Sequence, residues 1–177
     1  MGVLTVAVIG AGTMGAGIAQ VCAQAGWQTR LYDSFPEGLQ KGTDSIYAFW
    51  DNGIARGKTT EQQKSEWSAN LSSYENMSEA VADADLVIEA VPEVMELKRD
   101  IFRQLEEMAP PHAVLATNTS GLQIGEIARA TGCPERVIGM HFFNPVPLMS
   151  LLELVQHDLC SDATITAAQS IGSAMGK

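Results

Sequence analysis

The sequence is poor in basic residues and contains no long hydrophobic stretch. It has 11 Lys and Arg residues against 21 Asp and Glu residues, which gives a formal net charge of −10. A general nucleic-acid-binding protein needs a basic face to neutralise phosphates, so we expect no nucleic-acid partner. No apolar run reaches the roughly 18 residues that a membrane-spanning helix needs. The stretch from Met1 to Gly10 lacks the basic segment of a signal peptide, so no membrane partner is expected either.

Cysteine is also scarce, with Cys22, Cys133 and Cys160 as its only occurrences. Their odd number, their wide spacing and the lack of a C-x-x-C motif argue against a disulfide framework and against a zinc site. We therefore expect free thiols, no metal and a cytoplasmic location. The chain has 177 residues, of which 46% are hydrophobic and 18% charged, and this fits one globular domain over residues 1–177 rather than a disordered chain.

Short apolar runs alternate with helical patterns along the chain. The pattern predicts strands at 3–9, 28–33, 86–91, 113–117, 136–141 and 151–155, and helices at 14–25, 93–108, 123–130 and 161–175. Such alternation predicts βαβ units and an α/β fold of the Rossmann type, with a doubly wound, mostly parallel sheet covered on both faces.

Residues 36–67 interrupt this alternation after the second predicted strand. They indicate two helices broken at Asn52-Gly53 and at Gly57-Lys58, with Thr59 or Thr60 as the N-cap of the second helix. The segment is longer than a normal crossover. We therefore predict a helical hairpin that projects from the sheet.

A glycine-rich turn follows the first predicted strand and opens the first predicted helix. Gly10-Ala-Gly12-Thr13-Met14-Gly15 matches G-x-G-x-x-G in the strand-to-helix context that dinucleotide binding requires. Gly10 would permit the tight turn, Gly12 the approach of a pyrophosphate and Gly15 the close packing of helix on strand. The free N–H groups at the start of the helix, around Thr13 and Met14, would bind the phosphates.

Asp33 ends the second predicted strand, 18 residues after Gly15. A carboxylate at this place can accept hydrogen bonds from a ribose 2′-hydroxyl and would repel a 2′-phosphate. Ser34 and Phe35 follow, with no Arg to hold such a phosphate. The motif therefore predicts NAD rather than NADP as the cofactor. The alternative is a structural glycine turn with an aspartate that caps a local group.

Polar residues also follow the other predicted strands, whose carboxyl ends meet at one edge of the sheet. They are Glu93, Lys98, Asn118, Ser120, His141 and Asn144, with Glu153 in the last apolar run. A carboxylate beside an imidazole fixes its tautomer and makes it a better base. His141 with Glu153 is thus the candidate general base, although a core histidine and a solvent-facing glutamate are the alternatives. Ser120 lacks a G-x-S-x-G elbow, which favours a hydrogen-bond donor over a nucleophile.

Four motifs taken together resemble a known family. Gly10-Ala-Gly-Thr-Met-Gly-Ala-Gly-Ile-Ala-Gln20, Glu89-Ala-Val-Pro-Glu93, Thr117-Asn-Thr-Ser120 and His141-Phe-Phe-Asn-Pro-Val-Pro147 are similar to the N-terminal domain of L-3-hydroxyacyl-CoA dehydrogenases, including 3-hydroxybutyryl-CoA dehydrogenases. The resemblance covers nearly the whole chain. It implies the reversible, NAD-dependent oxidation of an (S)-3-hydroxyacyl-CoA to a 3-ketoacyl-CoA, in fatty acid metabolism and β-oxidation.

The resemblance also implies roles for individual residues. His141 would take the proton of the 3-hydroxyl group, and Glu153 would orient and charge His141. Ser120 and Asn144 match positions that contact substrate or cofactor near the reacting carbon. Glu93, Lys98 and Asn118 match positions near the NAD.

Three differences from the family pattern matter. The family continues past the equivalent of Gly176-Lys177 into a helical C-terminal domain that supplies another active-site Asn and most of a dimer interface. We therefore expect this chain to be the cofactor-binding domain or a fragment of a homodimeric enzyme, and to turn over poorly by itself. The predicted hairpin, where the family contacts CoA, is the weakest match, and Ser150 stands where many relatives carry Lys.

Two alternatives stay open at this point. A CoA-independent dehydrogenase of the carnitine or gulonate type would keep the fold and change the substrate, although Phe142 and Phe143 favour the CoA enzyme. A non-catalytic NAD-binding module is the second alternative. His112 and His157 lie outside the motifs, and we expect both at the surface.

Overall fold

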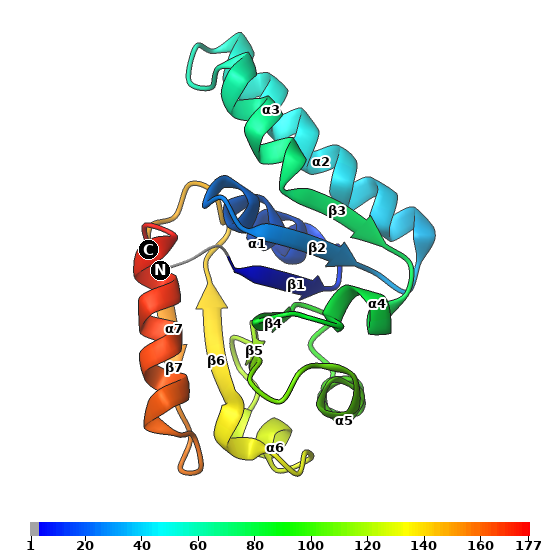
Figure 1. The fold of residues 1–177 in the computed structure, drawn as a ribbon, viewed down its shortest axis with the longest axis vertical. Helices are drawn as coiled ribbons and strands as arrows, with labels where there is room; N and C mark the ends of the chain where they lie inside the picture. The colour runs from blue at the N-terminus through cyan, green and yellow to red at the C-terminus, as the bar shows by residue number, and fades with distance from the viewer. Residues whose placement is uncertain (1–3) are drawn as a thin grey trace.

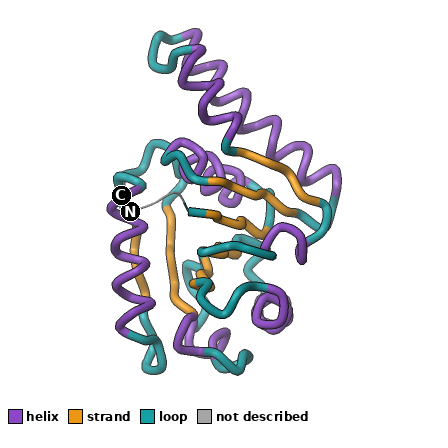
Figure 2. The backbone as a smooth tube through the Cα atoms, viewed as in Figure 1, coloured by secondary structure: helices purple, strands orange, loops and turns teal. Residues whose placement is uncertain are grey.

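Residues 4–177 are described here from a computed structural model, so the N-terminal end of the predicted 3–9 strand lies outside the described range. One sheet has the strand order β3-β2-β1-β4-β5-β6-β7 (Figures 1 and 2). The strands are β1 (Thr5–Ile9), β2 (Gln28–Tyr32), β3 (Leu71–Tyr74), β4 (Leu86–Glu89), β5 (Val114–Thr117), β6 (Val137–Phe142) and β7 (Leu152–Val155). All neighbouring pairs are parallel except β6 with β7, which is antiparallel. This is the doubly wound, mostly parallel sheet that the sequence predicts.

Helices cover both faces of the sheet. One face carries α1 (Thr13–Gln24) and α7 (Asp162–Ala174), and the other carries α4 (Met77–Val81), α5 (Met95–Met108) and α6 (Ile124–Ala128). Strand β1 shows the division, because Val6 and Val8 pack with the α1 side while Ala7 and Ile9 pack with the α5 side. Since side chains alternate along a strand, a sheet buried on both faces needs apolar residues at nearly every position.

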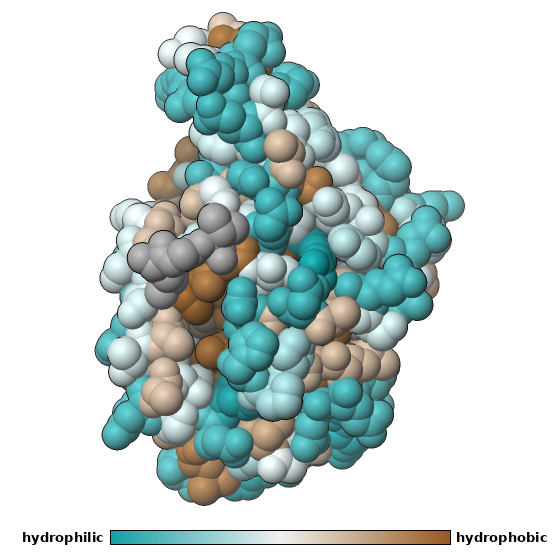
Figure 3. Space-filling view, viewed as in Figure 1, coloured by the Kyte–Doolittle hydropathy of each residue, from teal (hydrophilic) through white to brown (hydrophobic). Residues whose placement is uncertain are grey.

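A helical hairpin of α2 (Pro36–Ala55) and α3 (Glu61–Ala69) projects from the sheet (Figure 1), as predicted. Its outer end is mostly hydrophilic (Figure 3), and α3 buries no residue. The predicted break at Asn52-Gly53 is wrong, because α2 continues to Ala55. The turn after α2 folds back on Gly53, whose carbonyl accepts hydrogen bonds from the N–H groups of Lys58 and Thr59. Thr60 caps α3 with a capping box.

Three elements of the described residues were not predicted from the sequence, namely β3, α4 and the short 3-10 helix η1 (Pro134–Arg136). Strand β3 lies at the edge of the sheet and exposes Ser72 and Ser73, so its apolar pattern is too weak to detect. Helix α4 has only five residues. The start of α5 was also predicted too early, since the helix begins at Met95 rather than at residue 93. Within residues 4–177 no helix is both long and apolar enough to cross a membrane.

Candidate active site

The glycine turn connects β1 to α1, and its backbone packs closely against neighbouring backbone atoms. Gly10 has φ +104, and a Cβ at this residue would lie 2.8 Å from the Ala90 carbonyl oxygen. A Cβ on Gly15 would lie 1.7 Å from the Gly10 carbonyl oxygen, so only glycine allows the helix to pack here. Around Gly12, by contrast, a Cβ would meet nothing within 4 Å. Gly12 therefore faces open space beside the start of α1, where no side chain caps the helix.

Asp33, just after β2, holds this turn in place. Its Oδ2 accepts a hydrogen bond from the Ala11 N–H at 2.8 Å, and its Oδ1 accepts one from the Phe35 N–H at 2.9 Å. A carboxylate offers about four lone-pair sites, so each oxygen keeps room for one more donor. Asp33 can thus anchor the turn and still accept a hydrogen bond from a ligand hydroxyl.

Two adjoining cavities run along the carboxyl edge of the sheet. The first, which we call the glycine-turn cavity, has a volume of about 830 Å³ and is lined by Gly12, Asp33 and Phe35 among others. The second, which we call the His141 cavity, has a volume of about 340 Å³. Met14, Ala90 and Val91 line both cavities. The two cavities therefore adjoin, and we refer to them together as the cleft; each is of a size that suits a small ligand or part of a cofactor.

His141 and Glu153 face each other across the antiparallel pair of β6 and β7. The strand register sets them directly opposite, and the His141 Nδ1 lies 2.9 Å from the Glu153 Oε2. An ionised carboxylate can only accept a hydrogen bond, so in the neutral imidazole this contact assigns the proton to Nδ1 and leaves Nε2 as the acceptor. The His141 side chain is 19% exposed and lines the cavity, which is the arrangement of a general base with its orienting carboxylate.

The predicted polar residues Asn118, Ser120 and Asn144 line the same His141 cavity. Ser120 and Asn144 are exposed, so their side chains are available to a ligand. Asn118 is instead tied into the sheet, because its Oδ1 accepts a hydrogen bond from the Phe142 N–H at 2.8 Å. This contact joins the end of β5 to β6 next to His141.

Lys98 and Glu93 line the His141 cavity as well, and Lys98 also binds a buried residue, Glu89, that the sequence analysis did not single out. Glu89, at the end of β4, is fully buried and accepts a hydrogen bond from the Lys98 Nζ at 2.6 Å. Lys98 also lies 3.3 Å from the Glu93 Oε2. An acidic residue inside an otherwise apolar strand is the sequence signal that could have identified Glu89.

Glu93 is the member of this group that reaches solvent. Its carboxylate accepts hydrogen bonds from the Thr119 hydroxyl and from the Ser120 N–H. Burial by itself would raise the pKa of Glu93, but the Thr119 hydrogen bond and the Lys98 ammonium outweigh burial and lower the pKa below its usual value. Glu93 is thus held as a carboxylate at the wall of the cleft.

Comparison with known proteins identifies the family. Residues 5–177 match the family model described as "3-hydroxyacyl-CoA dehydrogenase, NAD binding domain". The chain belongs to the 3-hydroxyacyl-CoA dehydrogenase family. A Bacillus subtilis protein named "Probable 3-hydroxybutyryl-CoA dehydrogenase" is 41% identical over 177 residues, which are 100% of this chain and 61% of that protein. The 3-hydroxyadipyl-CoA dehydrogenase of Escherichia coli is 48% identical over 153 residues, which are 86% of this chain and 32% of that protein.

Solved structures of 3-hydroxyacyl-CoA dehydrogenases have the same fold. The crystal structure of 3-hydroxybutyryl-CoA dehydrogenase from Escherichia coli superposes with a TM-score of 0.96 at 42% identity, over 100% of this chain and 37% of that one. The chain therefore spans between 32% and 61% of the length of these relatives.

The residues of this 3-hydroxyacyl-CoA dehydrogenase domain fit NAD. The open space at Gly12 and the uncapped start of α1 suit a pyrophosphate, since free N–H groups and the helix dipole both attract anions. The Asp33 carboxylate lies in the same cavity and suits a ribose hydroxyl. Among residues 4–177 no cluster of three or more His, Cys, Asp or Glu side chains could hold a metal ion.

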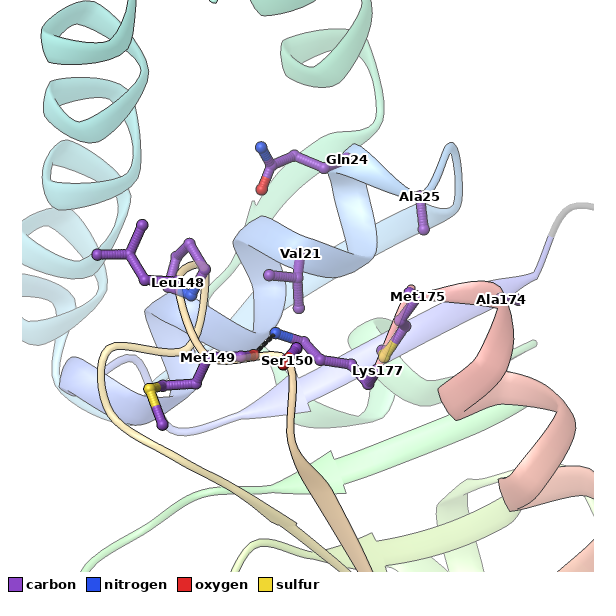
Figure 4. A pocket seen from close by; sticks show the side chains of 11 residues that line it. Val21, Gln24, Ala25, Leu148, Met149, Ser150, Ala174, Met175 and Lys177 are labelled. Carbon is purple, nitrogen blue, oxygen red and sulfur yellow. Dashed lines mark hydrogen bonds between the residues drawn. The ribbon is translucent and has the colours of Figure 1, made fainter. Parts of the chain in front are cut away.

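Two other features lie away from the cleft. His157 is not at the surface as expected, because its side chain is 5% exposed and its Nε2 lies 2.9 Å from the Val137 carbonyl oxygen. His112 is exposed, as expected, beside Asp85. A separate hollow of about 470 Å³ lies between the end of α1, residues 147–150 and the end of α7, where Lys177 donates hydrogen bonds to backbone carbonyls (Figure 4). None of the predicted site residues lines this hollow.

Proposed function

We propose that the protein to which this domain belongs oxidises an (S)-3-hydroxyacyl-CoA to the 3-ketoacyl-CoA with NAD, in a reversible reaction. The observation that carries the proposal is the 2.9 Å contact of His141 with Glu153, with His141 lining a cavity that adjoins the glycine-turn cavity. The curated relatives named above act on hydroxyacyl-CoA compounds according to their names. The fold alone would not choose a substrate, because one fold hosts many reactions.

The cofactor would be held along the cleft by residues from several strand ends. Gly10, Gly12 and Gly15 shape the turn. The N–H groups around Thr13 and Met14 would bind the phosphates, and the Asp33 carboxylate would accept a hydrogen bond from the ribose. Glu93, Lys98 and Asn118 line the far end of the cleft. Bound NAD supplies the acceptor for the hydride that leaves C3 of the substrate.

The protein side of the reaction is general base catalysis. His141 Nε2 takes the proton of the 3-hydroxyl group while the C3–H bond breaks, so that the C3–O bond becomes a carbonyl. Glu153 holds the Nδ1–H and stabilises the imidazolium that forms, as a carboxylate does in other histidine bases. Ser120 and Asn144, exposed in the same cavity, would hydrogen-bond the reacting oxygen or its neighbours. In the reverse direction the imidazolium returns the proton to the alkoxide oxygen.

The test is NADH oxidation that depends on acetoacetyl-CoA, measured with the complete protein. We expect turnover with the CoA ester and none with dehydrocarnitine, the ketone that a carnitine-type enzyme would reduce. Turnover with the CoA-free ketone alone would move the assignment to the carnitine type. NADH binding without turnover on any compound of a substrate panel would mean a non-catalytic module.

Three further expectations stay predictions of the sequence. They are the homodimeric state of the complete enzyme, its place in β-oxidation and its cytoplasmic location. Size-exclusion chromatography with light scattering of the complete protein tests the first. A monomer at micromolar concentration would contradict it.

A further inference from the structure

A closed ring of four hydrogen bonds and one ion pair lies under the wall of the His141 cavity. Glu89 accepts from the Lys98 Nζ at 2.6 Å through Oε1 and from the Thr117 hydroxyl at 2.7 Å through Oε2. Lys98 pairs with Glu93, and Glu93 accepts from the Thr119 hydroxyl. The Thr119 N–H donates to the Thr117 hydroxyl at 3.3 Å, which closes the ring. Strands β4 and β5, helix α5 and the loop after β5 are thereby joined.

Most of the ring is buried. Glu89 and Thr117 have 0% exposure, Lys98 has 1% and Thr119 has 4%. A buried ion pair is not a strong source of stability, because the loss of hydration offsets the attraction and apolar residues of similar size often serve as well. Stability is therefore a poor explanation for these side chains. What the ring does provide is one defined geometry for the groups attached to it.

The attached groups face the cleft. Glu93 emerges from the ring at the cavity wall, and its Oε1 accepts a hydrogen bond from the Ser120 N–H at 3.2 Å. The Leu122 N–H donates to the Thr119 hydroxyl at 3.0 Å, so the whole loop is attached to the ring. The position of Ser120 in the cavity thus depends in part on Glu89, Thr117 and Thr119, which do not line the cavity themselves.

We propose that Glu89 and Thr117 are positioning residues that, through this ring, hold Glu93 and Ser120 in place at the His141 end of the cleft. The proposal rests on the proposed function, since it takes this end of the cleft to be where cofactor and substrate meet.

The charge of Glu89 matters because the Lys98 ammonium is shared between the Glu89 and Glu93 carboxylates. The Lys98 ammonium donates hydrogen bonds to Glu89 and to the Val91 carbonyl oxygen, and it forms an ion pair with Glu93 at 3.3 Å. Without the Glu89 carboxylate, Glu93 alone would balance the Lys98 charge. Lys98 would then compete with Thr119 and Ser120 for the Glu93 oxygens, and the loop would loosen.

The main test compares Thr117→Val with Thr117→Ser in the 177-residue chain. Valine keeps the volume and removes the hydroxyl, whereas serine keeps the hydroxyl and removes a methyl group. If Thr117 only packs, serine should impair NADH binding more than valine does. If Thr117 is a positioning residue, valine should impair NADH binding more than serine does. We expect Thr117→Val to raise the NADH dissociation constant about tenfold and to speed hydrogen exchange at the Ser120 and Leu122 amides. Thr117→Ser should stay within about threefold of wild type.

A second variant tests the charge. Glu89→Gln keeps the size of the side chain, and we expect the same loss of NADH affinity and of Ser120 amide protection. Glu96→Gln is the matched control, because Glu96 also pairs with a base of α5, Arg99, but is 73% exposed. If Glu89→Gln does not fold, the Thr117 pair still decides the question.

The outcomes separate this proposal from the one on which it rests. If the wild-type chain does not bind NADH, the proposed function fails, and the exchange rate of the Ser120 amide still reports on the ring. If the wild-type chain binds NADH and Thr117→Val leaves either the affinity or the exchange rate unchanged, the positioning role is overturned.

Discussion

The Ala11 N–H donates a hydrogen bond to the Asp33 carboxylate at 2.8 Å, across 22 positions in the chain. The contact ties the end of β2 to the glycine turn after β1. One carboxylate therefore shapes the phosphate-binding turn and also lines the cavity in which a ribose would lie.

Replacing Asp33 by Asn should weaken NADH binding. It should also reduce the preference of the domain for NADH over NADPH. An amide has one acceptor oxygen instead of two, so one of the two backbone hydrogen bonds is lost, at a cost of about 1 kcal/mol. The repulsion of a 2′-phosphate also disappears. Fluorescence titration with both cofactors checks this, with the exposed Asp44→Asn as control. An unchanged ratio of the two dissociation constants would count against a ribose contact.

Substitutions of two glycines in the turn should have different effects, one on NADH binding and the other on folding. Gly12→Ala places a methyl group in open space, so the apo domain should lose no more than about 1 kcal/mol of stability. The same methyl group would occupy the space meant for the pyrophosphate, and NADH binding should fall at least tenfold. Gly15→Ala must displace the Gly10 backbone and should destabilise the domain strongly. Thermal melting and NADH titration of both variants test this, and equal effects on folding would contradict it.

His141 and Glu153 should affect turnover far more than folding. In the complete protein, His141→Ala should lower kcat by about 10² to 10⁴, the usual worth of a general base. Glu153→Gln should lower kcat by roughly tenfold or more, since the imidazolium loses its counter-charge. NADH affinity and melting temperature should stay near wild type because the Glu153 side chain is 53% exposed. His112→Ala is the control, and retention of full activity by His141→Ala would refute the assignment.

Glu93 should contribute stability that depends on pH. Its pKa in the folded domain is lowered below the ordinary value of 4.5, because the Thr119 hydrogen bond and Lys98 outweigh the opposing effect of burial. A lowered pKa means that the contribution is fully present above about pH 4.5 and is lost as the pH falls through the folded value. Its size should be at most about 1 kcal/mol, since the side chain is 44% exposed and solvent screens it.

Urea unfolding of wild type and Glu93→Gln at several pH values measures this effect. The stability difference between the two proteins should be constant near neutral pH and should shrink below pH 4.5. A difference that grows on acidification would mean that the sign of the pKa shift is wrong.

The 177-residue chain by itself should bind NADH and turn over slowly. Ser120 and Asn144 are exposed, so the His141 cavity is open to water and the substrate would be poorly oriented. Comparing kcat of this chain with that of the complete protein checks the prediction. Rates within threefold of each other would show that residues 1–177 hold the whole catalytic machinery.

Local signals in the sequence were sufficient for much of the fold. The apolar runs of the central strands and the Gly10–Gly15 turn depend on neighbours in the chain, so they could be predicted. Strand β3 could not, because an edge strand with exposed Ser72 and Ser73 forms only through its pairing with β2. The continuation of α2 through Gly53 likewise depends on the turn that folds back on it.

The class of fold, the glycine turn with its carboxylate, and a histidine and a glutamate suited to base catalysis could all be predicted from the order of residues. These features follow from periodicity and short spacings, which the order of residues contains directly. Which of these groups come into contact depends on the folded sheet. The antiparallel register of β6 and β7 sets Glu153 opposite His141, and the packing of α5 brings Lys98 onto Glu89. Such contacts depend on strand register and on burial, which are properties of the assembled sheet rather than of any one segment.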